Sequence, residues 1–209
     1  MPDTPPPWRD FDPAGLSRRE RYQLLTSLVV PRPIGWISTW SGPDAPNLAP
    51  FSYFAALASS PMLVGVSVGH RAAGPKDTLL NVRQYGAFCV NVVSAKLLEA
   101  MNATSADVPF GTDEFALAHL TPQASGRVDA PYVAEAPAVL ECEVSKEVEL
   151  DGAPNTLVVG RVVGVLVRSD LALVEGTLSV DPAALRPLGR LGGGAYALPG
   201  DVRVLPRPT

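Results

Sequence analysis

Two long alternating runs joined by a short turn constrain the fold of this chain more than any other feature. Residues 140–150 alternate apolar side chains with glutamates, and residues 156–167 form a valine-rich run. The Asp-Gly pair at 151–152 lies between them. Alternation with a period of two is typical of a half-solvated strand, and a turn between two such runs predicts an antiparallel hairpin. We therefore expect the glutamates, Glu141 among them, to face solvent.

Further short runs add strands to this hairpin. Residues 34–40, 48–57 and 88–93 are apolar and short enough for strands. In the run 62–70, valines occupy one face, whereas glycine and serine occupy the other. Because glycine weakens a strand, this bare face predicts that a ligand or another backbone approaches it closely.

Helices are few and short. Ser17 and Glu20 have the spacing of a capping box, and the helix that they predict ends before Pro31. Short helices are also expected at 78–84 and 94–102. Many strands at hairpin spacing with few helices favour a mainly β fold, an antiparallel barrel or sandwich with helical insertions.

The 209-residue length favours one domain. We expect an extended proline-rich arm over residues 1–13, a folded domain over 14–198 and a surface tail over 199–209. The sequence has neither a signal-peptide pattern nor an apolar stretch near the roughly 20 residues that span a bilayer. A cytoplasmic location is the resulting expectation.

Composition and motifs exclude several classes of function. The 17 basic and 21 acidic residues are well mixed, which argues against a nucleic-acid surface. Two isolated cysteines, Cys89 and Cys142, and two histidines, His70 and His119, are too few and too scattered for the usual metal sites, and buried thiols are expected. The motifs of serine hydrolases, P-loop proteins and classical dinucleotide-binding proteins are absent. Any redox chemistry therefore needs an imported cofactor.

The first candidate site is an anion site over residues 71–78. Arg71 and Lys76 supply positive charge, while Thr78 and the amides at the start of a helix supply hydrogen-bond donors. The alternative, which the local pattern leaves equally open, is that Asp77 only caps the helix and the cations are solvated.

Two further candidates could contact a flat, partly polar ring. Residues 33–39 and 47–54 carry small polar side chains in an apolar stretch, although turn and strand chemistry explains them as well. In the segment 190–196, three glycines permit close backbone approach, while Arg190 could hold an anionic edge and Tyr196 could cover a ring. A flexible terminal turn is the alternative for this third segment.

Taken together, these segments are recognisable. In order they are PRPIGWIST at 31–39, NLAPFSYF at 47–54, Lys76-Asp77-Thr78 with Asn81, then Asn91, Asp113-Glu114-Phe115, Glu141-Cys142 and Arg190-Leu191-Gly192-Gly193. Their order and spacing resemble the flavin reductase-like family, including flavoredoxin, over about residues 16–198.

The resemblance implies an antiparallel, Greek-key-like split β-barrel that binds FMN at the interface of a homodimer. The positions that it implies for the cofactor are Ser38 and Thr39 beside the isoalloxazine; Asn47, Ala49, Ser52, Tyr53 and Phe54 at its polar edge and ribityl chain; Arg71, Lys76, Asp77 and Thr78 at the phosphate; and Arg190 and Tyr196 closing the site. No catalytic side chain is needed, because the flavin carries the redox chemistry.

Three functions stay open at this stage. The first is an oxidoreductase in which NAD(P)H reduces bound FMN and the flavin passes electrons to a small-molecule acceptor. The second is an electron carrier that resembles flavoredoxin and exchanges electrons with protein partners. The third is a barrel that binds a ligand without redox activity, since one fold serves several functions.

Overall fold

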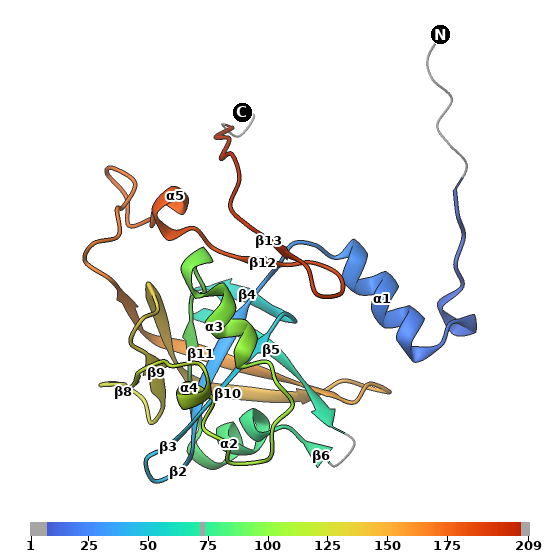
Figure 1. The fold of residues 1–209 in the computed structure, drawn as a ribbon, viewed down its shortest axis with the longest axis horizontal. Helices are drawn as coiled ribbons and strands as arrows, with labels where there is room; N and C mark the ends of the chain where they lie inside the picture. The colour runs from blue at the N-terminus through green and yellow to red at the C-terminus, as the bar shows by residue number, and fades with distance from the viewer. Residues whose placement is uncertain (1–7, 72–73, 206–209) are drawn as a thin grey trace.

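The computed structural model describes residues 8–71 and 74–205 (Figure 1). Its strands are β1 (Arg32–Pro33), β2 (Gly35–Gly42), β3 (Ala45–Phe51), β4 (Phe54–Ser59), β5 (Met62–Arg71), β6 (Gly74–Pro75), β7 (Ala87–Asn91), β8 (Pro122–Ala124), β9 (Pro131–Val133), β10 (Ala138–Glu149), β11 (Asn155–Val167), β12 (Gly189–Arg190) and β13 (Tyr196–Ala197). Its helices are η1 (Pro13–Gly15), α1 (Arg18–Leu28), α2 (Asp77–Tyr85), η2 (Ala95–Leu97), α3 (Leu98–Ala103), α4 (Glu114–Leu117) and α5 (Pro182–Leu185).

One curved antiparallel sheet forms the body of the molecule. Its strand order is β3-β2-β7-β10-β11-β5-β4, with β6 paired to β5. The hairpin expected from the two long runs is β10–β11, which pairs antiparallel along nearly its whole length. Both the mainly β class and this hairpin are therefore confirmed.

The sheet wraps around an inner core. This core takes residues from nearly every long strand and from α2: Ile37, Phe51, Val64, Val66, Val68, Leu79, Val82, Phe88, Val90, Cys142 and Val158. Since strands far apart in the sheet order contribute to one cluster, the sheet must curl into a barrel. The valine face of β5 points into this core, as its alternation predicts.

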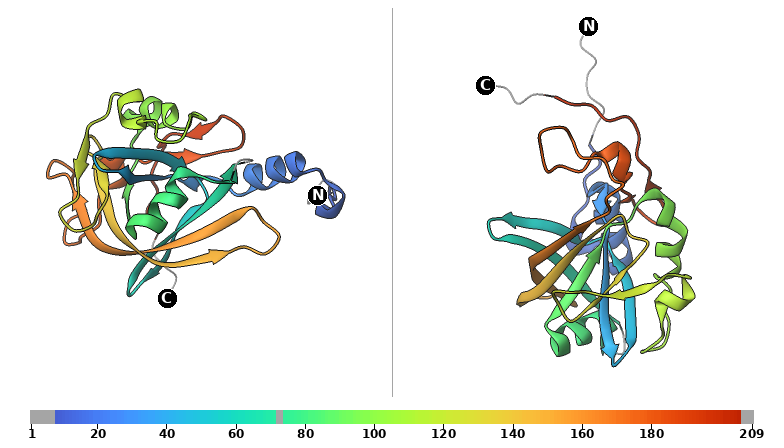
Figure 2. Two further views of the ribbon diagram at one scale, coloured as in Figure 1. Left: turned by 90° about the horizontal axis from the view of Figure 1, so that it is seen from below. Right: turned by 90° about the vertical axis from the view of Figure 1, so that its left-hand side faces the viewer.

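A second core lies on the outer face of β2, β7 and β10. Trp36, Cys89 and Val139 meet Met101 of α3 and Phe115 of α4 there. The segment between β7 and β10 covers this face, as the two views of Figure 2 show. This covering segment carries α3 and α4 to one side of the barrel.

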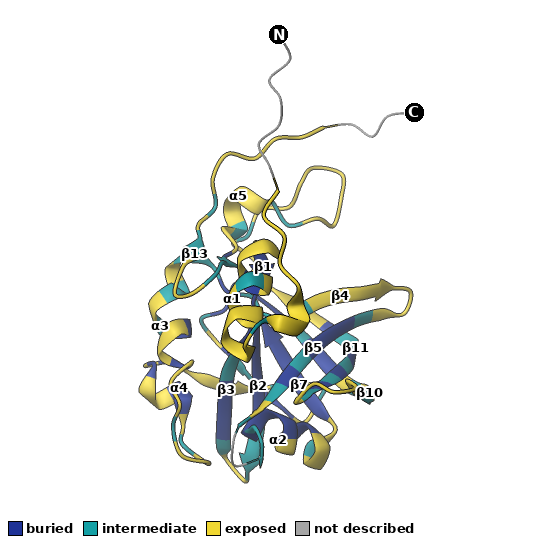
Figure 3. Ribbon diagram, turned by 90° about the vertical axis from the view of Figure 1, so that its right-hand side faces the viewer, coloured by how far each residue is buried: buried dark blue, intermediate teal, exposed yellow. Residues whose placement is uncertain are grey.

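Helix α1 projects from the barrel (Figure 2). The predicted capping box is present, with the Ser17 hydroxyl accepting from the Glu20 amide and the Glu20 carboxylate accepting from the Ser17 amide. Only Thr26 is buried on this helix, while Tyr22, Leu25 and Leu28 are 54%, 53% and 71% exposed. Figure 3 shows the helix as an exposed element beside a buried sheet. The described chain therefore leaves much of this apolar stripe uncovered.

Strand β3 forms one edge of the sheet. Two of its residues, Pro46 and Pro50, lack a backbone N–H, and the amide of Leu48 between them donates to the Glu114 carboxylate at 3.1 Å. This edge runs beside α4 and the end of α3, where the cavities described below are found.

Three expectations need correction. Glu141 is 1% exposed, because Ser125 and Arg127 cover its carboxylate on the outer face of β10, while Leu140 and Cys142 face the inner core as the alternation predicts. The bare face of β5 accommodates leucine side chains: a Cβ on Gly65 would lie 2.9 Å from Leu57 Cδ1. The helix expected at 94–102 divides into η2 and α3.

The expected terminal segments are described only in part. Residues 1–7 of the arm and 206–209 of the tail lie outside the described residues, whereas residues 8–12 and 201–205 are exposed. Within the described ranges, no helix is long and apolar enough to cross a membrane.

Candidate functional site

The first candidate site forms where β5 and β6 lead into α2. Lys76 occupies the N-cap position of α2 without a capping side-chain hydrogen bond, and Asp77 is the first helical residue. Asp77 accepts from Arg71 at 3.1 Å, so it pairs with the arginine and does not cap the helix through its side chain. The first amides of a helix have no partners inside it, so this end of α2 presents donors and the positive end of the helix dipole.

These residues surround a cavity of about 290 Å³, which we call the polar cavity. Its lining residues are Asn47, Ala49, Pro50, Arg71, Lys76, Asp77, Thr78, Thr104, Ser105, Ala106, Asp107 and Glu114. All four residues expected at a phosphate, together with Asn47 and Ala49, therefore lie at one cavity.

Charges of both signs face the polar cavity. Arg71 forms ion pairs with Asp77 at 3.1 Å and with Asp107 at 3.4 Å. Lys76 lies 5.5 Å over the Phe51 ring and forms no ion pair within the described chain. Burial first, and then the charge of Arg71, lower the pKa of Lys76. An anion in the cavity would stabilise the protonated lysine and so oppose this lowering of its pKa.

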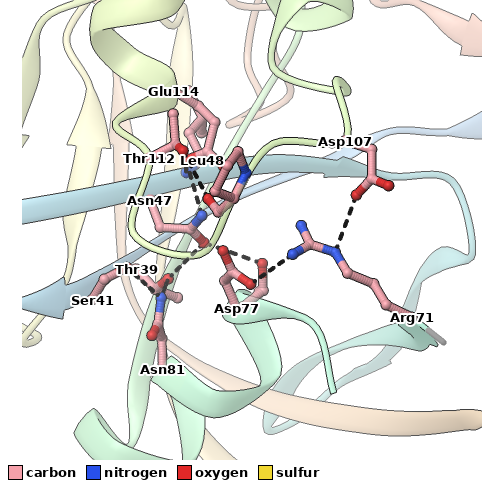
Figure 4. Close-up of polar contacts among 12 residues, drawn as sticks. Thr39, Ser41, Asn47, Leu48, Arg71, Asp77, Asn81, Asp107, Thr112 and Glu114 are labelled. Atoms are coloured by element: carbon pink, nitrogen blue, oxygen red, sulfur yellow. Dashed lines mark hydrogen bonds and ion pairs between the residues drawn. The ribbon is translucent and has the colours of Figure 1, made fainter. Parts of the chain in front are cut away.

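A buried hydrogen-bond network fixes Asn47 in the cavity wall (Figure 4). Its Nδ2 donates to Glu114 Oε2 at 2.9 Å, while its Oδ1 accepts from Thr39 at 3.2 Å and from Thr78 at 3.3 Å. Asn81 in turn donates to Thr39 at 2.9 Å. Because the Thr78 hydroxyl proton is already used, Thr78 can offer an anion its backbone amide but not this proton.

Ser38 and Thr39 do not line the cavities described here. Both are fully buried. Ser38 donates to the Pro131 carbonyl at 2.6 Å and accepts from Asn91, which ties β2 to β7 and β9. Thr39 orients Asn47. These two residues thus support the site from behind, and the structure does not bring their side chains to a cavity beside a ring.

A second cavity of about 150 Å³ adjoins the first. It is lined by Tyr22, Ile34, Pro50, Phe51, Ser52, Met101, Ser105, Arg190 and Tyr196, and we call it the Tyr196 cavity. Pro50 and Ser105 border both cavities. The structure therefore brings Ser52 together with Arg190 and Tyr196, which are remote from it in sequence.

The glycine-bearing terminal segment is held in a defined conformation. The Arg190 guanidinium stacks 4.4 Å from the centre of the Tyr196 ring and donates to the Gly193 carbonyl. The Tyr196 hydroxyl donates to Asn102 at 3.0 Å, and Gly193 has φ +61°, a conformation that glycine adopts without strain. The alternative of a free terminal turn is therefore not what the structure contains.

Tyr53 and Phe54 border a third, mostly apolar cavity of about 410 Å³ between α1, β4 and β5. Ser52 borders this cavity as well as the Tyr196 cavity. Burial raises the pKa of Tyr53, and the neighbouring Tyr22 adds to that effect.

Arg32 is a site residue that the sequence reasoning left without a role. It is 6% exposed and donates to the carbonyls of Thr26, Val29 and Leu191 at 2.7–3.0 Å and to Ser52 at 3.3 Å. Arg32 thus joins the end of α1, the β3–β4 turn and the glycine-bearing segment. In the sequence, only its position between Pro31 and Pro33 in the family motif marked Arg32. Glu114 was likewise part of a family motif to which no role had been assigned.

Within residues 8–71 and 74–205, no cluster of three or more His, Cys, Asp or Glu side chains is arranged to hold a metal ion. The chain is thus a barrel protein whose two adjoining cavities lie at a sheet edge, one lined by cations, carboxylates and hydrogen-bonding groups and the other bordered by Arg190 and the Tyr196 ring. A sequence model described as "Flavin reductase like domain" matches residues 27–180. The chain belongs to the flavin reductase-like family, and its fold is the split barrel of that family.

Solved structures agree with this assignment. The chain is similar to nitrilotriacetate monooxygenase component B from Bacillus cereus, with TM-score 0.91, 32% identity and coverage of 96% of this chain and 100% of that one. It is similar to 2-nitrobenzoate 2-nitroreductase of Pseudomonas fluorescens, with TM-score 0.86, 29% identity and coverage of 96% and 97%. It is also similar to a split-barrel protein from Shewanella frigidimarina, with TM-score 0.81, 24% identity and coverage of 93% of this chain and 95% of that one. This last similarity supports the fold alone.

Proposed function

We propose that this protein is an FMN-binding oxidoreductase in which NAD(P)H reduces the bound flavin. The observation that carries the proposal is the junction of the polar cavity with the Tyr196 cavity across Pro50 and Ser105. A phosphorylated flavin has an anionic end and a flat ring end, and the two cavities differ in the same way. Similarity to a nitroreductase at 29% identity supports a reductive activity.

The phosphate end fits the polar cavity by its donors. Lys76 has no carboxylate within ion-pair distance in the described chain, so its charge is available to a ligand. The amides that begin α2 add directed donors and a favourable dipole. Arg71 is already shared between Asp77 and Asp107, so its contribution to an anion is smaller.

The ring end fits the surface formed by residues 50–54 and the glycine-bearing segment. Arg32 donates to the Ser52 oxygen at 3.3 Å, which leaves the Ser52 hydroxyl proton free to donate to a ring acceptor. Tyr196, fixed by Arg190 and Asn102, offers an aromatic surface at the other wall. When bound, FMN would supply the hydride and electron chemistry, while these groups bind it and orient it.

We further propose that the protein acts as a homodimer with the flavin near the interface. The support is the exposed apolar side of α1 with Leu25 and Val29, each 53% exposed, beside Leu57 of β4, 48% exposed. These residues border the apolar cavity, which adjoins the Tyr196 cavity at Ser52. A second copy of the chain that covered this face would bury apolar surface next to the flavin ring.

The first test is an anaerobic spectrum. Purified protein loaded with FMN is mixed with NADH and then with NADPH, and loss of the flavin absorbance near its visible maximum is followed. Rapid bleaching by either nicotinamide is expected. A bound flavin that neither nicotinamide bleaches would refute the donor but not the cofactor, whereas failure to bind FMN would refute both.

A matched pair of variants tests the phosphate assignment. Lys76→Ala removes the unpaired cation of the polar cavity, and Lys146→Ala removes an exposed lysine of β10 that borders none of the cavities described. A lost charge-assisted contact costs about 1.5–3 kcal/mol, so Lys76→Ala should weaken FMN binding by about tenfold or more. Lys146→Ala should bind FMN like the wild type. Riboflavin, which lacks the phosphate, should bind both variants equally.

A further inference from the structure

Glu114 presents a buried carboxylate to the polar cavity. It is the first residue of α4 and is 4% exposed. Its Oε2 accepts from Asn47 Nδ2 at 2.9 Å and from the Leu48 amide at 3.1 Å. Neither donor is charged, and no cation lies within ion-pair distance of Glu114 in the described chain. An ionised carboxylate in such a place is costly unless a cation or further donors compensate it.

The charged groups around Glu114 do not compensate it. Strand β3, on which α4 packs, contains no charged residue. Helix α2 offers Asp77, whose negative charge acts on Glu114, and the segment before α4 offers Asp107 and Asp113. The two cations of the cavity are directed elsewhere, since Arg71 pairs with Asp77 and Asp107, and Lys76 lies over Phe51.

Burial is the main cause that raises the pKa of Glu114, and the charge of Asp77 adds to it. The hydrogen bonds from the Leu48 amide, from the amide of Glu114 itself and from Asn47 act in the opposite direction but do not cancel the effect of burial. A further anion placed in the same cavity would raise this pKa again, because a like charge disfavours the ionised form. Binding an anion and binding a proton at Glu114 are therefore thermodynamically linked.

We propose that Glu114 controls phosphate binding in the polar cavity by taking up a proton from solvent when the anion binds. This inference rests on the proposed function, and it names the residue that sets the strength and pH dependence of FMN binding. Since Oε2 already accepts two hydrogen bonds, the proton is held on Oε1. The protonated acid removes the negative charge from the cavity wall and keeps Asn47 and the Leu48 amide in position.

The competing interpretation gives Glu114 a purely structural role, as an acceptor that fastens β3 to α4. Glu114→Gln separates the two, because the glutamine oxygen can still accept from Asn47 and Leu48 while the charge and the titration are gone. Asp107→Asn is the matched control: it removes a carboxylate from the same cavity, but one whose side chain is 89% exposed.

The experiment is isothermal titration of FMN into the full-length protein at pH 8, in buffers of different ionisation enthalpy, which reports the protons taken up. At this pH the FMN phosphate is already a dianion, because its second pKa is about 6. Wild type and Asp107→Asn should take up more protons than Glu114→Gln, in which any remaining uptake belongs to Lys76, whose lowered pKa the anion also raises. Riboflavin should bind the wild type without proton uptake.

Affinity gives a second readout. If the anion raises the pKa of Glu114 by about one unit, removing the charge changes the affinity about tenfold. Glu114→Gln should therefore bind FMN about tenfold more tightly than the wild type where the wild-type Glu114 is ionised, and the two affinities should converge as the pH falls and Glu114 becomes protonated. FMN binding without proton uptake, or uptake that is unchanged in Glu114→Gln, would overturn this inference and leave the proposed function standing. Absence of FMN binding by the wild type would overturn both.

Discussion

Arg32 is expected to be the main anchor of helix α1. It is 6% exposed, and two of its four acceptors, the carbonyls of Thr26 and Val29, lie at the end of that helix. The last carbonyls of a helix have no partners inside it, and their partial negative charge favours a cation. Because α1 buries only Thr26 against the rest of the chain, few other contacts hold it in place.

The cost of Arg32→Met follows from these bonds. Leaving a buried acceptor unsatisfied costs about 1–3 kcal/mol, so the two helix carbonyls together lose about 2–6 kcal/mol. Removing a buried charge that has no carboxylate partner offsets a part of this loss. We expect the free energy of unfolding to fall by about 2–4 kcal/mol.

Urea unfolding followed by tryptophan fluorescence gives the change in stability, and hydrogen exchange of the α1 amides locates it. Arg83→Met is the control, because Arg83 forms a largely exposed pair with Glu147 at 2.8 Å and such pairs contribute about 0–1 kcal/mol. If Arg32→Met unfolds within about 0.5 kcal/mol of the wild type with unchanged protection of α1, the anchoring role is refuted.

Two further predictions concern the barrel interior. Gly160→Ala would place a Cβ against the ring of Phe88, which is fully buried, so a loss of about 1–3 kcal/mol is expected in thermal unfolding; Gly42→Ala, where the nearest atom is 3.8 Å away, should be nearly neutral, and equal losses would contradict this. Burial raises the pKa of Cys142 to about 12 and that of Cys89 as well, so a thiol reagent at pH 8 should label neither in the folded protein and both in urea. Rapid labelling before unfolding would refute their burial.

Local patterns predicted the secondary structure well, since the hairpin of β10 and β11 and the capping box of α1 depend on neighbouring residues. The burial of Glu141 could not be predicted in this way. It depends on Ser125 and Arg127, which are distant in sequence and which the fold brings over the strand. Period-two reasoning correctly separates the two faces of β10 here, but it assumes that the outer face is solvated, and at Glu141 another segment covers that face.

In the candidate site, too, contacts between residues close in sequence were predictable and contacts between distant residues were not. Arg71, Lys76 and Thr78 are near one another in sequence, so the strand-to-helix pattern alone predicted their cluster. The meeting of Ser52 with Arg190 and Tyr196 depends on the pairing of β1 with β12, which was not predicted; only the family resemblance assigned the three residues to one site. The placement of Ser38 and Thr39 behind the wall follows from strand orientation, and a motif match does not report which way a side chain points.

The exposed edge of β3 has a consequence for assembly. On the side of the strand that faces away from β2, a further strand would need the amide protons of residues 46, 48 and 50. Prolines remove two of these donors, and the Glu114 carboxylate already occupies the third. An incoming polypeptide therefore finds no ladder to extend at this margin of the barrel, which protects the chain from edge-to-edge aggregation.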